Sequence, residues 1–182
     1  MHLQKVNLFL FILVFFFKVD ISAQGYYIDQ KFELSIGRGS SLYNDIKSDQ
    51  LILFIKIPQL SIGSSMLNFE SDVNIEFISK SGNNIYVLGF LPFIKYNFSV
   101  NNFNLFIKGG IGLNYLNHTI IGNRSLGGHF IFSDMIGIGT KILDIQNIKL
   151  EFTYLFRHIS NAGIYKNNEG YNSQYFIISF LI

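Results

Sequence analysis

The sequence contains no cysteine, no tryptophan and only two prolines among its 182 residues. The absence of cysteine excludes a disulfide framework and a thiolate metal site. Charges of the two signs nearly balance, with 14 Lys and Arg against 12 Asp and Glu, and they are scattered along the chain. A formal charge of +2 without a basic cluster argues against a nucleic-acid-binding surface. Beyond residue 23 no apolar run approaches the roughly 20 residues that a membrane-spanning helix needs.

Aromatic side chains are abundant instead. The chain has 20 Phe and 10 Tyr, and its mean hydropathy of +0.30 is high for a soluble domain. Charged residues nevertheless occur every few positions after the N-terminal segment. This combination is typical of a membrane protein that is not built from hydrophobic helices.

The N-terminal segment has the three parts of a secretory signal peptide. Lys5 precedes an unbroken apolar run at residues 8–17, and Ser22-Ala23 form a small-residue cleavage site. The alternative is a membrane anchor, but ten apolar residues are short for a span of about 20. We therefore expect a signal peptide at residues 1–23 and one mature domain at residues 24–182.

The mature chain alternates apolar and polar residues in eight runs, most of them near ten residues long. The third run is the clearest, with Phe69, Val73, Ile75 and Phe77 on one parity and Glu70, Asp72, Asn74 and Glu76 on the other. The other runs lie at residues 28–36, 51–57, 86–98, 103–115, 130–141, 149–157 and 176–182. An even number of such strands predicts an all-β fold, an eight-stranded antiparallel transmembrane β-barrel of the outer-membrane type.

A soluble, lipocalin-like barrel is the alternative fold, with its apolar face lining the interior. Aromatic stripes with charges on the opposite parity favour the membrane barrel. We expect the opposing charges to pair inside a narrow, packed lumen; they include Glu70, Glu76, Lys108, Glu151 and Arg157. The last run keeps its alternation to Ile182, where outer-membrane barrels commonly end in an aromatic residue, so recognition by the barrel-assembly machinery is expected to be weaker.

A polar pair interrupts the apolar stripe of the seventh run. His158 and Ser160 continue the parity of Tyr154 and Phe156, so they should share the lipid-facing side at the end of that strand. With a periplasmic N-terminus this strand rises towards the cell exterior, which places the pair at the outer leaflet. The alternative interpretation is that they are two interfacial polar residues at a strand end without a catalytic role.

The pair also has the composition of a hydrolytic site. A serine hydroxyl is a poor nucleophile without a base, and a histidine near it can take the proton. Asn172 and Gln174 share the parity of Phe176 on the last strand, so they are expected beside the pair. Asn161 and Gly163 follow the serine in a tight turn whose N–H groups are candidates to bind an oxyanion.

The block His158-Ile159-Ser160-Asn161-Ala162-Gly163, followed by Asn168, Gly170 and Asn172, resembles the signature of the PagL-type lipid A 3-O-deacylases, also called acyloxyacyl hydrolases. Residues 89–96, 109–112 and 127–132, with Asp134, Gly137 and Gly139, are similar to earlier strands of that family. The resemblance covers roughly residues 85–182, and the first strands fit only in pattern.

This resemblance implies a Gram-negative outer-membrane enzyme that removes an ester-linked acyl chain from lipid A. It implies Ser160 as nucleophile and His158 as general base. Asn161, Gly163 and Asn168 would support the oxyanion or the loop. The acid of the family is a glutamate fourteen residues after the histidine, where this chain has Asn172. An amide orients an imidazole but does not offset its positive charge, so we expect a slower enzyme, or one that uses Glu169 as the orienting acid.

The resemblance implies no cofactor and no metal. His118 and His129 lie eleven residues apart with no acidic partner at ligand spacing, which favours interfacial or luminal histidines. The expected partners are lipid A or lipopolysaccharide as substrate, outer-membrane lipid and the barrel-assembly machinery, without nucleic acid. Two other functions fit the pattern: a non-catalytic structural or adhesive barrel, and a phospholipase-type barrel.

Overall fold

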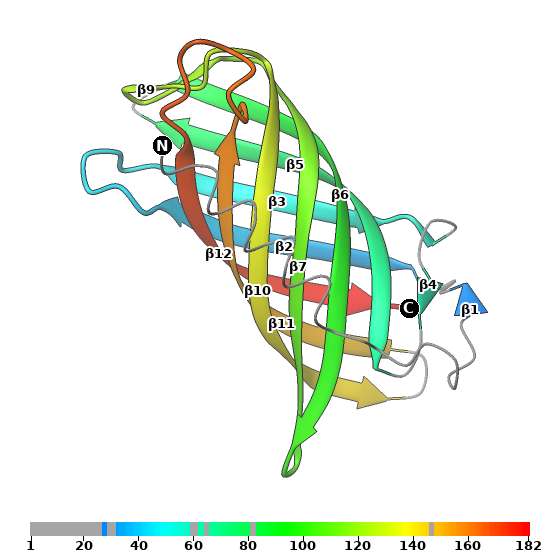
Figure 1. Cartoon of the computed structure of the whole chain (residues 1–182). Coiled ribbons are helices and arrows are strands. Elements are labelled where there is room, and N and C mark those ends of the chain that lie inside the picture. Colours follow the sequence, from blue (N-terminus) through cyan, green and yellow to red (C-terminus); the bar gives the residue numbers. More distant parts are fainter. Residues whose placement is uncertain (1–26, 29–31, 59–61, 64–65, 81–82, 146–147) are drawn as a thin grey trace.

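The computed structural model describes residues 27–28, 32–58, 62–63, 66–80, 83–145 and 148–182 (Figure 1). The long strands are β2 (Glu33–Ser41), β3 (Asp49–Lys56), β5 (Leu67–Lys80), β6 (Asn83–Val100), β7 (Phe103–Leu116), β10 (Phe130–Ile145), β11 (Ile148–Ser160) and β12 (Tyr171–Leu181). Four two-residue strands complete the described part: β1 (Tyr27–Ile28), β4 (Ile62–Gly63), β8 (Ile120–Ile121) and β9 (Arg124–Ser125).

The eight long strands form a closed antiparallel barrel. Their order is β5-β3-β2-β12-β11-β10-β7-β6, and β6 pairs with β5 to close the sheet. This confirms the predicted fold, an eight-stranded antiparallel barrel of the outer-membrane type. Closure leaves no long strand with an unpaired edge, which matters in lipid because no water is there to bond the backbone. Among the described residues there is no helix with the length and hydropathy of a membrane span.

The N-terminal prediction agrees less well with the strand boundaries. The first run was predicted at residues 28–36, but β2 begins at Glu33 and continues to Ser41, while Tyr27–Ile28 pair separately with β4. The predicted signal peptide at residues 1–23 lies outside the described residues and stays a prediction.

Alternation along each strand separates an apolar outer face from a packed lumen. On β6, Tyr86 and Leu88 are 46% and 53% exposed, whereas Val87 and Leu91 between and beyond them are 1% and 0% exposed. The polar residues of β5 that were predicted to face inward do so, since Glu70, Asp72, Asn74 and Glu76 are all buried. The lipocalin-like alternative is therefore wrong about which face carries the polar side chains.

Apolar and charged layers alternate down the lumen. An apolar layer near the loops 42–48, 117–129 and 161–170, here called the capped end, contains Ile78, Val87, Leu116, Ile159 and Tyr171, among others. A second apolar layer in the middle contains Phe54, Leu91, Phe93, Leu155 and Tyr175, among others. Because Arg157 lies between Ile159 and Leu155 on β11, its charge sits between the two apolar layers.

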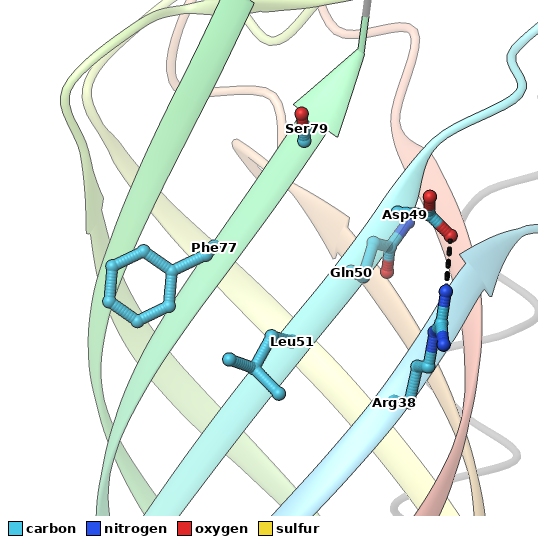
Figure 2. A pocket seen from close by; sticks show the side chains of 6 residues that line it. All are labelled: Arg38, Asp49, Gln50, Leu51, Phe77 and Ser79. Atoms are coloured by element: carbon cyan, nitrogen blue, oxygen red, sulfur yellow. Dashed lines mark hydrogen bonds and ion pairs between the residues drawn. The ribbon is translucent and has the colours of Figure 1, made fainter.

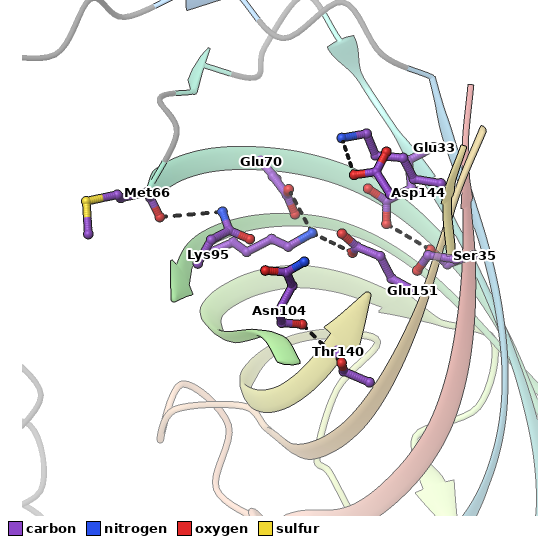
Figure 3. Close-up of polar contacts among 12 residues, drawn as sticks. Glu33, Ser35, Met66, Glu70, Lys95, Asn104, Thr140, Asp144 and Glu151 are labelled. Carbon is purple, nitrogen blue, oxygen red and sulfur yellow. Dashed lines mark hydrogen bonds and ion pairs between the residues drawn. The ribbon is translucent and has the colours of Figure 1, made fainter. Parts of the chain in front are cut away.

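Of the five buried charges predicted to pair, Glu70, Glu76, Glu151 and Arg157 do so, whereas Lys108 has aromatic neighbours. Arg157 Nη1 donates to Glu76 Oε2, its Nη2 donates to Asn114 Oδ1 at 2.7 Å, and Tyr175 Oη donates to the other oxygen of Glu76. Nearer the opposite end of the barrel, Lys95 Nζ lies 2.6 Å from Glu151 Oε2 and 3.6 Å from Glu70 Oε1 (Figure 3).

Lys108 is also buried, and its ammonium lies 4.8 Å from the centre of the Phe93 ring. The lumen is filled with side chains at this level.

Inward glycines permit this packing in a narrow barrel. A Cβ on Gly110 would lie 2.2 Å from Pro92 O, and one on Gly112 would lie 2.0 Å from Leu91 Cδ2. A Cβ on Gly89 would lie within 2.3 Å of the side-chain oxygens of both Asn74 and Asn114. The glycine cluster at residues 109–112 thus serves packing inside the barrel, as its position in a strand predicts.

Replacing Arg157 with methionine is expected to destabilise the barrel by about 3–5 kcal/mol. The reason is that Glu76, which is 1% exposed, would lose its guanidinium partner inside the lumen. The denaturant midpoint in detergent micelles measures the loss. The double variant Arg157→Met/Glu76→Gln removes both charges and should recover much of the stability. A loss below about 1 kcal/mol in the single variant would contradict a structural role for the pair.

The loops at the capped end pack on one another. Leu126 and Ile121, from the segment that links β7 to β10, are buried together with Ile46 against the apolar layer at the capped end. Asn123 Nδ2 donates to Asp45 Oδ2 at 2.8 Å, and this hydrogen bond lowers the pKa of the Asp45 carboxyl. These contacts join two loops that are far apart in the sequence.

Candidate active site

His158 and Ser160 lie on the outward face of β11, at its capped end. Both are partly buried and share the parity of Tyr154 and Phe156, while Arg157 points into the lumen. The strand places them as the two-residue period predicts. The structure therefore brings the proposed base and nucleophile to one face of the barrel wall.

Asn172, on β12, is the hydrogen-bond partner of His158. It is the direct register partner of His158, and its Oδ1 lies 2.5 Å from His158 Nδ1. Because an amide oxygen only accepts, this contact favours the neutral tautomer with its proton on Nδ1 and its lone pair on Nε2. This is the tautomer in which Nε2 can accept a proton from a serine hydroxyl.

Glu169, the alternative orienting acid, is engaged elsewhere. Its Oε2 accepts the backbone N–H of Ser125 at 2.5 Å, and its own N–H donates to Ser125 O at 3.0 Å. Arg124 Nη1 also donates to the carbonyl of Glu169 at 2.8 Å. Glu169 is thereby tied to the β8–β9 hairpin, and Asn172 is the residue that contacts the imidazole.

Gly170 lets the loop approach the imidazole closely. Its φ is +63°, and a Cβ there would lie 2.7 Å from His158 Cε1 and 3.4 Å from Nε2. Arg124 Nη1 lies 3.3 Å from the carbonyl oxygen of Gly170, and the Arg124 guanidinium lies 3.6 Å from the centre of the Tyr43 ring. The imidazole therefore has a hydrogen bond on one side and an anchored backbone against its other edge.

The turn after Ser160 is organised by Asn161. The Asn161 side chain, which is 0% exposed, donates from Nδ2 to Leu126 O and Asn167 O, both at 2.7 Å. Its Oδ1 accepts the N–H of Gly163 at 2.8 Å, and its own N–H donates to Asn168 Oδ1 at 3.0 Å. Asn161, Gly163 and Asn168 thus hold the loop together here. An oxyanion would have to displace one of these acceptors, so their role towards an oxyanion stays a prediction.

Asp134 is a neighbour of the histidine to which the sequence reasoning gave no role. It is the register partner of His158 on β10, opposite to Asn172, and it is exposed on the outer face. Directly opposite residues of an antiparallel pair have Cβ atoms about 5 Å apart, so the carboxylate lies within electrostatic reach of the imidazole. The sequence pattern contains a signal for this residue. Asp134 has the same parity as Phe130 and Ile136, so it is a charged residue within an apolar stripe.

The sequence comparison identifies the family of this chain. The family model described as "Lipid A 3-O-deacylase (PagL)" matches residues 57–180, which is more than half of the chain. The chain belongs to the PagL family of lipid A deacylases. The match includes β11 and nearly all of β12, and so covers His158, Ser160 and Asn172. None of the curated proteins matches the sequence.

Solved structures agree with the PagL assignment at the level of the fold. The crystal structure of the outer membrane enzyme PagL matches with a TM-score of 0.66 and 24% sequence identity, over 81% of this chain and 97% of that one. Neisserial surface protein A matches with a TM-score of 0.52 and 15% identity, over 84% of this chain and 94% of its own. At these identities the likeness shows a shared barrel fold.

Within the described residues, no hydrogen bond joins His158 to Ser160. Base–nucleophile contacts in hydrolases commonly tighten only when substrate binds, so this geometry does not exclude the pair. The described part of the chain also has no group of three or more His, Cys, Asp or Glu side chains placed to hold a metal ion.

Proposed function

We propose that this chain hydrolyses the 3-O acyl ester of lipid A, with Ser160 as nucleophile and His158 as general base, in the outer leaflet of the outer membrane. Membership of the lipid A 3-O-deacylase family supports the substrate class and the ester position. The observation that carries the mechanism is the hydrogen bond from His158 Nδ1 to Asn172 Oδ1, because it leaves Nε2 free to act as a base.

The reaction proceeds in two halves. His158 Nε2 takes the proton of Ser160 Oγ while Oγ attacks the ester carbonyl carbon, and the resulting imidazolium then protonates the leaving sugar oxygen. This gives an acyl ester on Ser160 and a free sugar hydroxyl. In the second half a water molecule attacks the acyl ester with His158 again as base, which releases a fatty acid and restores Ser160.

The position on the outer wall fits a lipid substrate. The acyl ester of a lipid lies near the boundary between headgroups and acyl chains, and β11 presents the pair at the end of an apolar stripe that includes Tyr154 and Phe156. A lipid molecule beside the barrel reaches such a site by lateral diffusion without passing through the lumen, which is filled with side chains.

Mass spectrometry of lipid A tests the proposal. A Gram-negative host whose lipid A keeps its 3-O acyl chain is grown with and without expression of this chain. We expect a lipid A species that lacks one hydroxyacyl chain, together with the free acid, only in the expressing cells. Unchanged lipid A with new lysophospholipids would instead indicate a phospholipase, and no change in either lipid class would indicate a non-catalytic barrel.

A further inference from the structure

The outer wall between the level of His158 and the middle of the barrel carries a belt of polar side chains on β11, β12, β2 and β3. Between the capped end and the middle of the barrel, the outward positions of β12, β2 and β3 include Gln174, Ser40, Arg38 and Asp49. The strands on the far side, β6 and β7, carry Tyr86, Leu88, Leu113 and Tyr115 at comparable positions. We call Tyr154, Gln174, Ser40, Arg38 and Asp49 the polar belt.

Hydrogen bonds connect the belt from strand to strand. Tyr154 Oη donates to Gln174 Oε1 at 2.8 Å, and Gln174 Nε2 donates to Ser40 Oγ at 3.4 Å. Ser40 is in turn the register partner of Asp49 on β3. The belt thus begins on β11, the strand of the proposed catalytic pair, and runs across β12 and β2 to β3.

The belt ends in an exposed ion pair above a hollow. Arg38 Nη2 lies 3.3 Å from Asp49 Oδ1, and their side chains are 79% and 81% exposed. The two residues border a shallow hollow of about 330 Å³ whose wall also includes Leu51 and Phe77 (Figure 2). Charges are placed above apolar side chains here, which matches the polarity of a lipid that has an anionic headgroup and acyl chains.

The guanidinium of Arg38 has N–H donors that its contact with Asp49 does not use. Arginine carries five N–H donors in a planar fork, and only one contact to Asp49 is made. Such a fork binds phosphate oxygens well, often through two hydrogen bonds at once. An arginine on the lipid-facing wall is costly unless its charge lies at the headgroup level or meets an anion, so its position calls for a polar or anionic neighbour.

We propose that the polar belt is the headgroup subsite for a phosphorylated disaccharide lipid, with Arg38 contacting a sugar phosphate and the hollow over Leu51 and Phe77 receiving one of its uncleaved acyl chains. This rests on the proposed function, since the bound lipid is the substrate cleaved at Ser160. β2 is the second strand from β11, about 10 Å across the sheet at a strand spacing near 4.8 Å, and Arg38 is level with Tyr154, roughly 20 Å along the strands from Ser160. The long side chain of Arg38, which reaches Asp49 at the level of Ser40 nearer the capped end, covers part of this distance, and the phosphorylated disaccharide covers the rest.

Binding measurements in the Ser160→Ala background test the subsite without consuming the lipid. Affinity is measured in detergent micelles for lipid A with its sugar phosphates and for the same lipid after enzymatic removal of the phosphates. Arg38→Gln is expected to weaken binding of the phosphorylated lipid by about three- to tenfold and to leave the dephosphorylated lipid little affected. Asp49→Asn is expected to strengthen binding of the phosphorylated lipid by about twofold, because it removes a negative charge beside the phosphate.

The two substitutions break the same ion pair. The direction in which each one changes the affinity for the phosphorylated lipid therefore distinguishes a phosphate subsite from a purely structural pair. A purely structural pair predicts that both variants change binding in the same direction, and that result would overturn the proposal. Equal losses for the two lipids in Arg38→Gln would also overturn it. Lys141→Gln removes one positive charge from β10 near the opposite end of the barrel and should leave the phosphate dependence unchanged. If the wild type released no fatty acid, the proposed function would fail. The changes in affinity of the Arg38 and Asp49 variants would still support or overturn the subsite.

Discussion

Replacing Ser160 with alanine is expected to lower the rate of lipid A hydrolysis by a factor of about 10⁴ or more. The hydroxyl is the proposed attacking group, and alanine leaves no atom that can form the acyl ester. His158→Gln should cost a similar factor, because a serine without its base is a poor nucleophile. The double variant should be no slower than either single variant, since residues that act as one unit lose their effect together.

Release of fatty acid from purified lipid A in detergent micelles gives these rates. Both side chains are on the outer wall, away from the packed lumen, so the substitutions should leave the barrel folded. Migration of unheated and heated samples in a denaturing gel checks this. A Ser160→Ala protein that keeps more than about a tenth of the wild-type rate would exclude a covalent serine mechanism at this site.

The barrel could be predicted from the sequence because its dominant signal is local. The alternation of Phe69, Ile75 and Phe77 with Glu70 and Glu76 depends only on the two-residue period of a strand, and the structure separates these side chains into outer face and lumen accordingly. The capped end could not be predicted in this way. Its order comes from contacts between distant segments, such as Asn161 Nδ2 with Leu126 O, which no local period reveals.

The same distinction applies to the site. Parity was enough to predict that His158 and Ser160 share a face and that Asn172 points outward beside them. Choosing between Asn172 and Glu169 required the pairing of residues 124–125 with residues 169–170, a contact between two loops. Placing Asp134 opposite His158 required the register of β10 on β11, which is shifted by an irregularity between Lys141 and Leu143.

Replacing Asn172 with aspartate is expected to raise the rate of lipid A hydrolysis by about 10- to 10³-fold. Aspartate has the shape of asparagine, so the contact from His158 Nδ1 is kept while a negative charge is added. The charge stabilises the imidazolium that forms as Ser160 attacks, and losing such a charge in a serine triad costs about 10⁴. Asn172→Leu, which removes the acceptor altogether, should lower the rate, because the imidazole then loses its orientation as well.

Asp134 sets how large the gain from aspartate at position 172 can be. If its carboxylate already offsets part of the imidazolium charge across the β10–β11 pair, Asp134→Asn slows the wild type, and the gain from Asn172→Asp is larger in the Asp134→Asn background than in the wild type. Rates of the four proteins in this cycle, measured on the same lipid A micelles, give the coupling directly. An Asn172→Asp rate equal to wild type in both backgrounds would contradict the charge argument, because the imidazolium would then need no carboxylate on either side.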